Sequence, residues 1–120
     1  MRTDLPFPGT ATALIPGVLP GVEAYTVKAN ATFPGSRPAL RGVVCLHSGT
    51  DGALLALPDP ATVTAWRTGL AAALGTDALA AAARTVHAPV GLPWQALALA
   101  RAAYRRAERL GIGATTDLPG

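Results

Sequence analysis

The sequence is poor in cysteine, lysine and aromatic residues. Cys45 is its single cysteine, so an intramolecular disulfide is excluded and a reducing compartment, the cytoplasm, is the expected location. No apolar run reaches the roughly 18 residues that a membrane helix needs, and the N-terminal MRTDLPFPG lacks the apolar segment of a signal peptide. We therefore expect a soluble intracellular protein with no membrane partner.

Charge is also scarce. Only 14% of the residues are charged, and 10 Lys+Arg against 7 Asp+Glu give a net charge of +3. Four arginines lie within the last predicted helix, so the sequence shows no basic footprint for a nucleic acid, and we expect no nucleic-acid partner. All cations except Lys28 are arginine. A general bias toward Ala, Arg, Gly and Pro explains the arginines and leaves this one lysine as the exception.

What the chain does contain is apolar and small. Half of its 120 residues are hydrophobic, alanine is the commonest of them, and aromatics make up 5%. This length predicts one domain, residues 1–120, in which a sheet-and-helix block over 1–80 precedes a turn and closing helix over 84–120. A core built from small side chains is thin and would gain from an oligomer, so we expect a homodimer.

The first half of the sequence has the pattern of a β-sheet, in which strand-like stretches alternate with residues that favour turns. VEAYTVKANATF and ALRGVVCLHS are rich in β-branched and aromatic residues and predict two strands, the second covered on both faces. TATALIPGVLPG predicts a short strand broken by Pro-Gly pairs at 16–17 and 20–21, and GTDG predicts a hairpin into ALLALP. We expect three or four strands in antiparallel meander order.

The second half has helical spacing. Asp59 is a candidate N-cap and Pro60 suits a first helical position, which predicts a helix over 60–74, a break at GTD (75–77) and a short alanine-rich turn after it. Pro93 predicts the start of a second helix that ends at Leu110 because Gly111 follows. The expected fold is α+β, an antiparallel sheet packed against two helices.

Lys28 is the first candidate for chemistry. Side chains alternate along a strand, so Tyr25 and Val27 are expected to pack, while Thr26, Lys28 and Asn30 point to the opposite face. Lys28 is then either an exposed lysine that keeps the sheet soluble or a cation directed into a pocket. In a pocket its pKa would shift readily, so it could act as a general acid or base, or as an amine that forms a Schiff base.

Arg67 is the second candidate. It lies three or four positions from Val63, Leu70 and Leu74, on or beside the apolar stripe of its helix. A buried guanidinium needs an anionic partner, which is either a ligand or a protein carboxylate such as Asp59 or Asp77.

The remaining reactive residues do not form a site. His47 and His87 are far apart in the sequence and have no metal-ligand spacing to Cys45, so no metal is expected, and Cys45 suits an inert core thiol. GIGATT at 111–116 lacks the third glycine, the preceding strand and the following helix of a dinucleotide fingerprint. No cofactor is expected.

Three stretches resemble the ornithine cyclodeaminase/mu-crystallin family. They are VKANATFPG, RGVVCLHSGTDGALLALPDPATVTAWRTGLAAALGTDALA and RTVHAPVGLPWQALALARAAYRRAERLGIGA. Members of that family are NAD(P)-dependent and act on amino acids, either deaminating and cyclising them or reducing ketimines. The chain resembles the family's substrate-binding and dimerisation domain, which pairs with its twin through the sheet. The Rossmann domain that lies between the second and third stretches in the family is absent here.

The resemblance assigns roles residue by residue. Lys28 and Arg67 match cations that hold the substrate carboxylate, and Arg2 matches a third. Val90 and Gly91 match a turn that contacts the substrate, whereas Ala96 stands where many members have an aspartate.

Two functions follow from these roles. The first is an NAD-independent enzyme or binding protein, such as a cyclase, lyase or isomerase with Lys28 as the acid or base. Its ligand would be amino-acid-like or a cyclic imine. The second is a non-catalytic dimerisation or partner subunit of a full-length relative.

Overall fold

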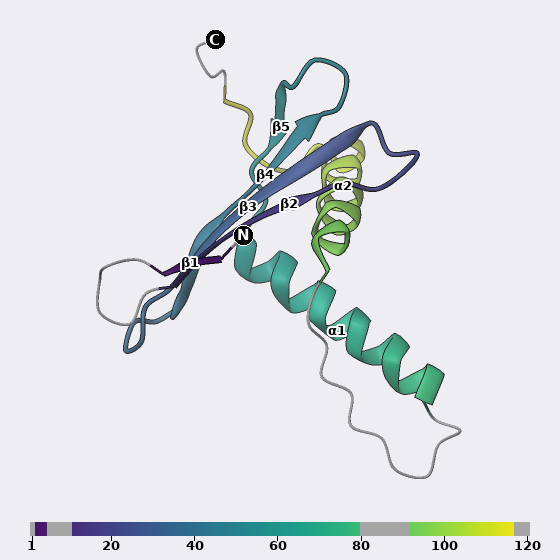
Figure 1. Cartoon of the computed structure of the whole chain (residues 1–120). Coiled ribbons are helices and arrows are strands. Elements are labelled where there is room, and N and C mark those ends of the chain that lie inside the picture. The colour runs from purple at the N-terminus through teal and green to yellow at the C-terminus, as the bar shows by residue number, and fades with distance from the viewer. Residues whose placement is uncertain (1, 5–10, 80–91, 117–120) are drawn as a thin grey trace.

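The structure is a computed structural model that describes residues 2–4, 11–79 and 92–116, with side chains described for 14–75 and 92–116 (Figure 1). It contains an antiparallel sheet and two helices, as the sequence predicts. The strands are β1 (Arg2–Asp4), β2 (Ala11–Gly17), β3 (Ala24–Thr32), β4 (Leu40–Ser48) and β5 (Leu54–Ala56), and the helices are α1 (Pro60–Leu79) and α2 (Pro93–Leu110).

The sheet is a meander in which each strand pairs with its neighbour in the sequence, in the order β1-β2-β3-β4-β5. Both helices lie on the same side of it: α2 packs on β2 and β3, and α1 packs on β4 (Figure 1). The helices therefore cover one face of the sheet. The prediction that β4 is covered on both faces is wrong, because the described residues place a helix on one face only.

Turn chemistry explains most of the strand boundaries, with one exception. Pro20 and Gly21 form the turn between β2 and β3, where Gly21 has a left-handed φ of 76°. The break predicted at 16–17 is wrong, because Pro16 and Gly17 lie inside β2 and pair with Val27 and Thr26. Proline can occupy a strand near the edge of a sheet, where its missing N–H breaks no ladder hydrogen bond.

Helix α1 begins where its cap predicts. Asp59 accepts a hydrogen bond from the Thr62 N–H at 2.7 Å, and Pro60 is the first helical residue. The helix then continues through residues 75–77 to Leu79, so the predicted break is wrong. A single helical glycine costs only about 1 kcal/mol, and the alanines and leucines around it favour the helix. The rest of the predicted alanine-rich turn lies outside the described residues.

Helix α2 has the predicted bounds. Gly111 adopts a left-handed conformation with φ 61°, and its N–H donates to the carbonyl of Glu108 at 3.3 Å. At the other end, the Leu92 N–H donates to the side chain of Gln95 at 3.0 Å. These caps fix where α2 lies along the sequence.

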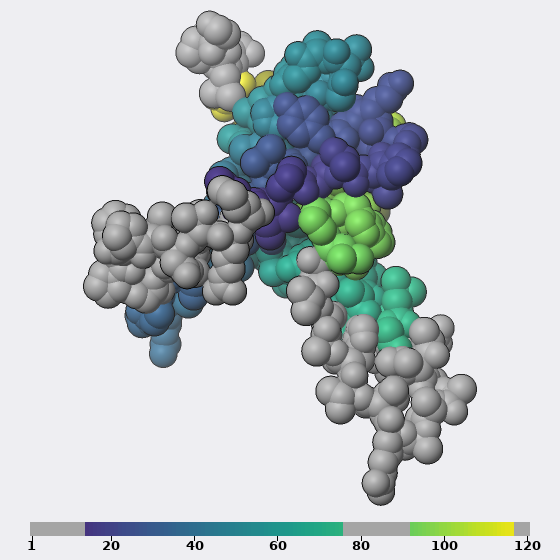
Figure 2. All heavy atoms as spheres, in the orientation of Figure 1, coloured from purple at the N-terminus to yellow at the C-terminus, as the bar shows by residue number. Residues whose placement is uncertain are grey.

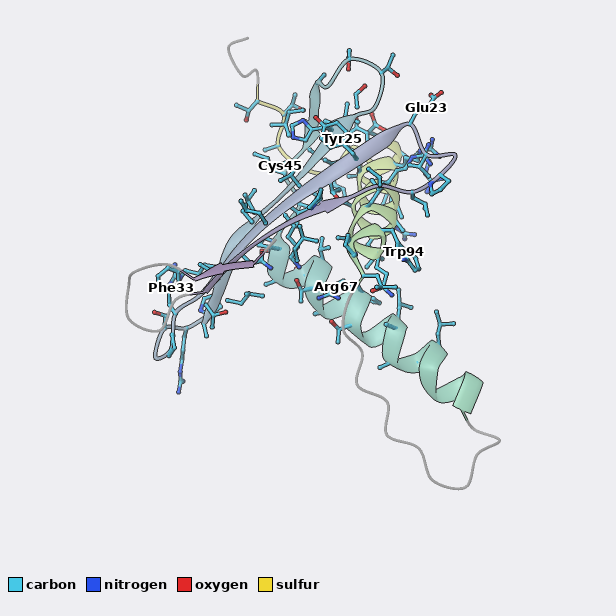
Figure 3. All side chains as sticks on the ribbon, in the orientation of Figure 1. Glu23, Tyr25, Phe33, Cys45, Arg67 and Trp94 are labelled. Carbon is cyan, nitrogen blue, oxygen red and sulfur yellow. The ribbon has the colours of Figure 1, made fainter. Side chains whose placement is uncertain are left out.

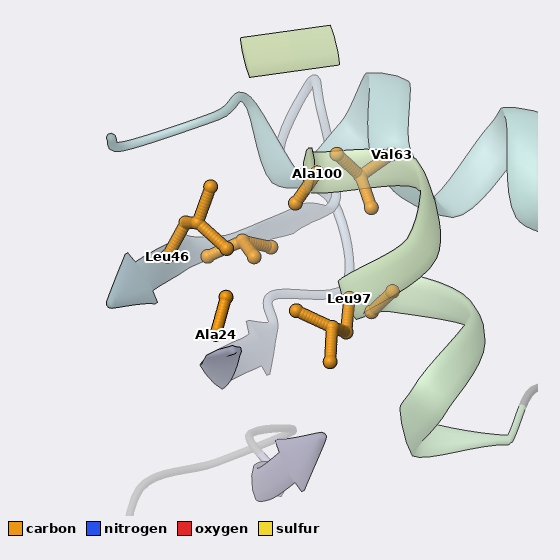
Figure 4. Close-up of a cluster of buried hydrophobic side chains, with 7 residues drawn as sticks. Ala24, Leu46, Val63, Leu97 and Ala100 are labelled. Atoms are coloured by element: carbon orange, nitrogen blue, oxygen red, sulfur yellow. The ribbon is translucent and has the colours of Figure 1, made fainter. Parts of the chain in front are cut away.

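The core lies between the sheet and the two helices (Figure 4). It is small, as the alanine-rich composition predicts, and α2 supplies as many of its residues as the sheet. Its buried members are Ala24, Val44, Leu46, Val63, Ala96, Leu97 and Ala100.

The two faces of β3 are the reverse of the prediction. Thr26 and Lys28 face the helices and are buried, whereas Val27 is 36% exposed on the opposite face. Alternation along a strand sorts side chains into two sets, but the position of the helices decides which set is inside. Here the inner set contains the hydroxyl of Thr26 and the ammonium of Lys28. These are polar groups that the sequence alone predicts on the outer face.

The face of the sheet away from the helices is lined by small and apolar side chains. We call it the open sheet face, and strand register assigns to it Pro16, Tyr25, Val27, Ala29, Val43 and Cys45. Each is half-buried or exposed, and Figure 3 shows Tyr25 and Cys45 on this part of the sheet. Cys45 is thus a half-buried thiol on this face instead of the core thiol that the sequence suggests.

Helix α1 stands out from the rest of the molecule (Figure 2). Trp66, Leu70 and Leu74 are exposed along it, the last at 70%. The apolar stripe predicted to bury Leu70 and Leu74 is therefore wrong beyond the first turns, where Val63 is buried. No helix among the described residues is long and apolar enough to cross a bilayer.

Candidate functional site

Lys28 lies on the inner face of the sheet, beside the core. In the register of the sheet it stands between Ile15 of β2 and Val44 of β4, and its side chain is only 3% exposed. It is the only charged residue among the buried residues of the described chain. Of the two interpretations left open by the sequence, the exposed solubilising lysine is wrong.

Helix α1 supplies the hydrogen-bond partner of this lysine. The Lys28 Nζ donates to the Thr64 Oγ1 at 2.5 Å, which joins β3 to α1 across 36 positions of sequence. Thr64 follows the core residue Val63, in the turn of α1 that packs against the sheet. The partner of Lys28 is a neutral hydroxyl and carries no charge to offset the ammonium.

Arg67 lies one helical turn beyond Thr64 on α1 (Figure 3). Its side chain is partly buried, and its Nη1 is buried without a hydrogen-bond partner. Asp59, one of the two carboxylates considered for it, is exposed and caps the helix through Thr62. The side chain of Asp77, the other, lies outside the described residues. Spacing on the helix thus predicts correctly that Arg67 is drawn toward the protein interior.

The two cations affect one another. Burial lowers the pKa of the Lys28 amine below its ordinary value, and the positive charge of Arg67 lowers it further. No carboxylate contributes to the shift in the opposite direction. The site is therefore electropositive and lacks an anion among the described residues.

Two more buried polar atoms flank Lys28 on the same face of β3. Neither the Thr26 Oγ1 nor the Asn30 Oδ1 has a hydrogen-bond partner among the described residues. Buried polar atoms are nearly always paired, and leaving one unpaired costs about 1–3 kcal/mol. Together with the Arg67 Nη1, three buried polar atoms on β3 and α1, the two elements joined by the Lys28–Thr64 bond, lack a partner among the described residues.

Gly42 and Gly17 lack a side chain, and this leaves room for the Asn30 Oδ1 and the Thr26 Oγ1, the two unpaired atoms of β3. A Cβ at Gly42, opposite Asn30, would lie 2.1 Å from the Ala29 carbonyl oxygen and 2.7 Å from the Asn30 Oδ1. A Cβ at Gly17 would lie 2.6 Å from the Thr26 Oγ1 and 2.5 Å from the Pro93 carbonyl oxygen of α2. No larger residue fits at either position without a shift of the backbone.

The other predicted site residues are not brought to Lys28 by the described structure. Arg2 lies in β1, opposite Ala13, and its side chain is not described. Val90 and Gly91 lie outside the described residues. Ala96, the position of an aspartate in many family members, is buried in the core on α2. The site as described therefore consists of Lys28 and Arg67 with their polar neighbours.

Sequence reasoning missed Thr64. Its position three residues before Arg67, and hence on the same side of the helix, was the available signal. Strand alternation also predicts correctly that Lys28, Thr26 and Asn30 lie together, because residues two apart on a strand share a face.

Other parts of the molecule offer less chemistry. No group of three His, Cys, Asp or Glu side chains among the described residues is placed to hold a metal. His47 stacks on Tyr25 with ring centroids 4.9 Å apart, and its Nδ1 lies 3.0 Å from the Gly52 carbonyl oxygen. A hollow on α1 of about 340 Å³ is lined by Ala65, Trp66, Gly69 and Leu70, and none of these can ionise.

Arg67 and Lys28 can together hold an anion. An arginine presents paired donors that suit a carboxylate, and a lysine adds a compact charge beside it. An amine with a lowered pKa can also exchange protons or act as a nucleophile closer to neutral pH.

Comparisons of the chain with models of protein families, with curated proteins and with solved structures found no match. The resemblance to the ornithine cyclodeaminase/mu-crystallin family thus rests on its motifs and stays a prediction.

Proposed function

We propose that this protein binds a small carboxylate-bearing ligand between Lys28 and Arg67. The observation that carries the proposal is the pairing of two buried or partly buried cations without a carboxylate between them, since the Arg67 Nη1 has no partner and Lys28 has only the Thr64 hydroxyl. A buried charge is normally paired. A ligand carboxylate would provide the missing anion for both cations.

The motif resemblance gives the class of ligand, an amino-acid-like molecule or a cyclic imine. A carboxylate fits the two cations, and the unpaired Asn30 Oδ1 could accept from an amino or imino N–H of the same molecule. We propose that the ligand is held without a nicotinamide cofactor. If the protein is an enzyme, it is a cyclase, lyase or isomerase in which Lys28 exchanges the proton.

Isothermal titration calorimetry with alanine, proline and pyruvate tests the proposal on the native protein and on Lys28→Ala and Arg67→Ala. A charge-assisted hydrogen bond contributes about 1.5–3 kcal/mol, so each variant should bind at least about tenfold more weakly. Arg105→Ala, which removes an exposed arginine of α2, is the matched control and should bind normally. Equal affinity in all variants, or no binding of any of the three ligands, would contradict the proposed binding of a carboxylate between Lys28 and Arg67. A clear isotherm with NAD would contradict cofactor independence.

We also propose that the protein is a homodimer joined through the open sheet face. The six defined residues at the middle of this face carry no charge, Arg41 and His47 lie at its two ends opposite Ala31 and Tyr25, and no helix of the described chain covers it. Apolar area of this kind marks protein interfaces. The small core gives a second reason, because a dimer would add buried area to it.

The open sheet face also favours the alternative function, a non-catalytic dimerisation or partner subunit. Calorimetry distinguishes the two, because a purely structural subunit needs neither Lys28 nor Arg67 for ligand binding. The proposed compartment is the cytoplasm, where the single Cys45 would stay reduced.

A further inference from the structure

The amine of Lys28 has the surroundings of a nucleophile. It is buried at 3% exposure, and its hydrogen-bond partner is the uncharged Thr64 Oγ1. The neighbouring charge is the like charge of Arg67, and together with burial it lowers the pKa of the amine. Lysines activated for covalent catalysis are desolvated or placed beside another cation, and Lys28 is both.

We infer that Lys28 forms a covalent imine with the carbonyl carbon of an α-keto acid whose carboxylate is bound by Arg67. This inference rests on the proposed carboxylate site and names the reactive group of its ligand. In an α-keto acid the carbonyl is bonded directly to the carboxylate, so one small molecule can meet the guanidinium and the amine at once. Arg67 would then hold the carboxylate, while the Lys28 amine in its neutral form meets the adjacent carbonyl carbon.

The reaction needs no oxidant, reductant or further reactant. The neutral Nζ adds to the carbonyl carbon and gives a carbinolamine. The former carbonyl oxygen then leaves as water with both hydrogens of the amine, and a carbon–nitrogen double bond joins the ligand to Lys28. The neutral imine then takes up a proton from solvent, and in this protonated form it withdraws electrons from the adjacent carbon, which is the usual reason for covalent catalysis by lysine.

The buried polar atoms beside Lys28 suit this intermediate. The Thr26 Oγ1 and the Asn30 Oδ1 lack partners and stand two residues away on either side of Lys28, on the same face of β3. A carbinolamine hydroxyl and a departing water both need hydrogen-bond partners inside a dry site. The Thr64 hydroxyl, already bonded to Nζ, can pass a proton between the amine and the departing oxygen.

The chain allows an unusually direct test, because Lys28 is its only lysine. The protein is incubated with pyruvate, reduced with sodium cyanoborohydride and examined by intact and peptide mass spectrometry. The N-terminal α-amine is the other amine, and peptide mapping separates it from Lys28. We expect an irreversible adduct at Lys28, and Lys28→Arg, which keeps the charge, should show none.

Acetone and the Arg67→Ala variant test the role of the carboxylate. Acetone has the carbonyl without the carboxylate, so it should label native Lys28 at least about tenfold more slowly than pyruvate, and this comparison needs no variant to fold. Pyruvate should label Arg67→Ala more slowly by a similar factor. Equal labelling by acetone and pyruvate would overturn the inference, as would labelling confined to the N-terminus.

Lactate separates this inference from the proposed function, because it keeps the carboxylate and lacks the carbonyl. If calorimetry detects lactate but pyruvate does not label Lys28, the imine is wrong and the carboxylate site stands. If neither acid binds and no adduct forms, the carboxylate site itself is wrong.

Discussion

Lys28 on β3 and Thr64 on α1 are joined by a hydrogen bond of 2.5 Å between the Nζ and the Oγ1. This bond is the polar link between the sheet and α1 at the candidate site. It fixes the direction of the lysine side chain toward the helix that also carries Arg67. The position of the amine therefore depends on a residue to which the sequence motifs assign no role.

Replacing Thr64 with valine should destabilise the protein by about 1–3 kcal/mol, because a buried donor loses its partner. Valine keeps the branched shape and removes only the hydroxyl. The free energy of unfolding from urea titration measures the effect. Thr68→Val, one turn further along α1 and also partly buried, is the matched control and should have a smaller effect. If both variants lose the same free energy, the Lys28 bond has no special role.

The lowered pKa of Lys28 predicts a pH dependence of stability. The folded state releases the proton at lower pH than the unfolded state, whose lysine has its ordinary pKa of 10.5. Between these two values the unfolded state binds more protons, so the free energy of unfolding should rise with pH.

Urea titrations from about pH 7 to about pH 10 measure this slope, and Lys28→Met should flatten it. The comparison with the variant removes contributions from tyrosines, including Tyr104, whose pKa is raised by its hydrogen bond to Glu108. An unchanged slope in Lys28→Met would show that the amine titrates equally in both states.

Gly42→Ala should destabilise the sheet by about 1–3 kcal/mol, as overpacking does. The new Cβ would lie 2.1 Å from the Ala29 carbonyl oxygen, which is backbone and can move only if the strands shift. The same shift would displace Asn30, so ligand affinity should fall as well. Gly69→Ala on α1 is the control, because its Cβ would meet nothing within 4 Å. It should stabilise the helix by about 0.5–1 kcal/mol.

Leu97→Ala should have the largest effect on stability, about 2–5 kcal/mol. Leu97 is fully buried between α2 and the sheet (Figure 4), and alanine would leave a cavity in a core that has few large side chains. Leu110→Ala, on the same helix but 57% exposed, should change the free energy of unfolding by no more than about 0.5 kcal/mol. If the two variants lost the same free energy of unfolding, Leu97 would not belong to the core.

Val27→Asp should separate a dimer formed through the open sheet face. A carboxylate at the centre of an apolar interface would be buried without a partner. Sedimentation equilibrium of the variant should give the mass of one chain, and the native protein that of two. Val18→Asp, at a position 71% exposed just after β2, should leave the dimer intact. A native protein that sediments as one chain would contradict the proposal directly.

The sequence predicts the elements of this fold better than their orientation. Pro93 and Gly111 mark both ends of α2 because their backbone preferences are local. The GTD segment misleads because a single glycine is a weak breaker when helix-favouring residues surround it. Which face of β3 is buried is a tertiary property, set by where α1 and α2 pack, and no local pattern contains it.

The candidate site shows the same division. Strand alternation places Thr26, Lys28 and Asn30 together, and helical spacing draws Arg67 inward, and both are local rules. The contact between Lys28 and Thr64 joins residues 36 positions apart, so no local sequence pattern predicts it and it is found only in the folded structure. The carboxylate ligand itself stays a prediction that the experiments above test.

Helix α2 supplies three of the seven buried hydrophobic residues and is the last element of the described chain to be synthesised. The hairpins of the meander join neighbours in sequence, so they can form one after another as the chain leaves the ribosome. The part of the inner face on which α2 packs, over β2 and β3, would then stay uncovered until α2 emerges. Closure of the core is thus a late event in the biosynthesis of this protein.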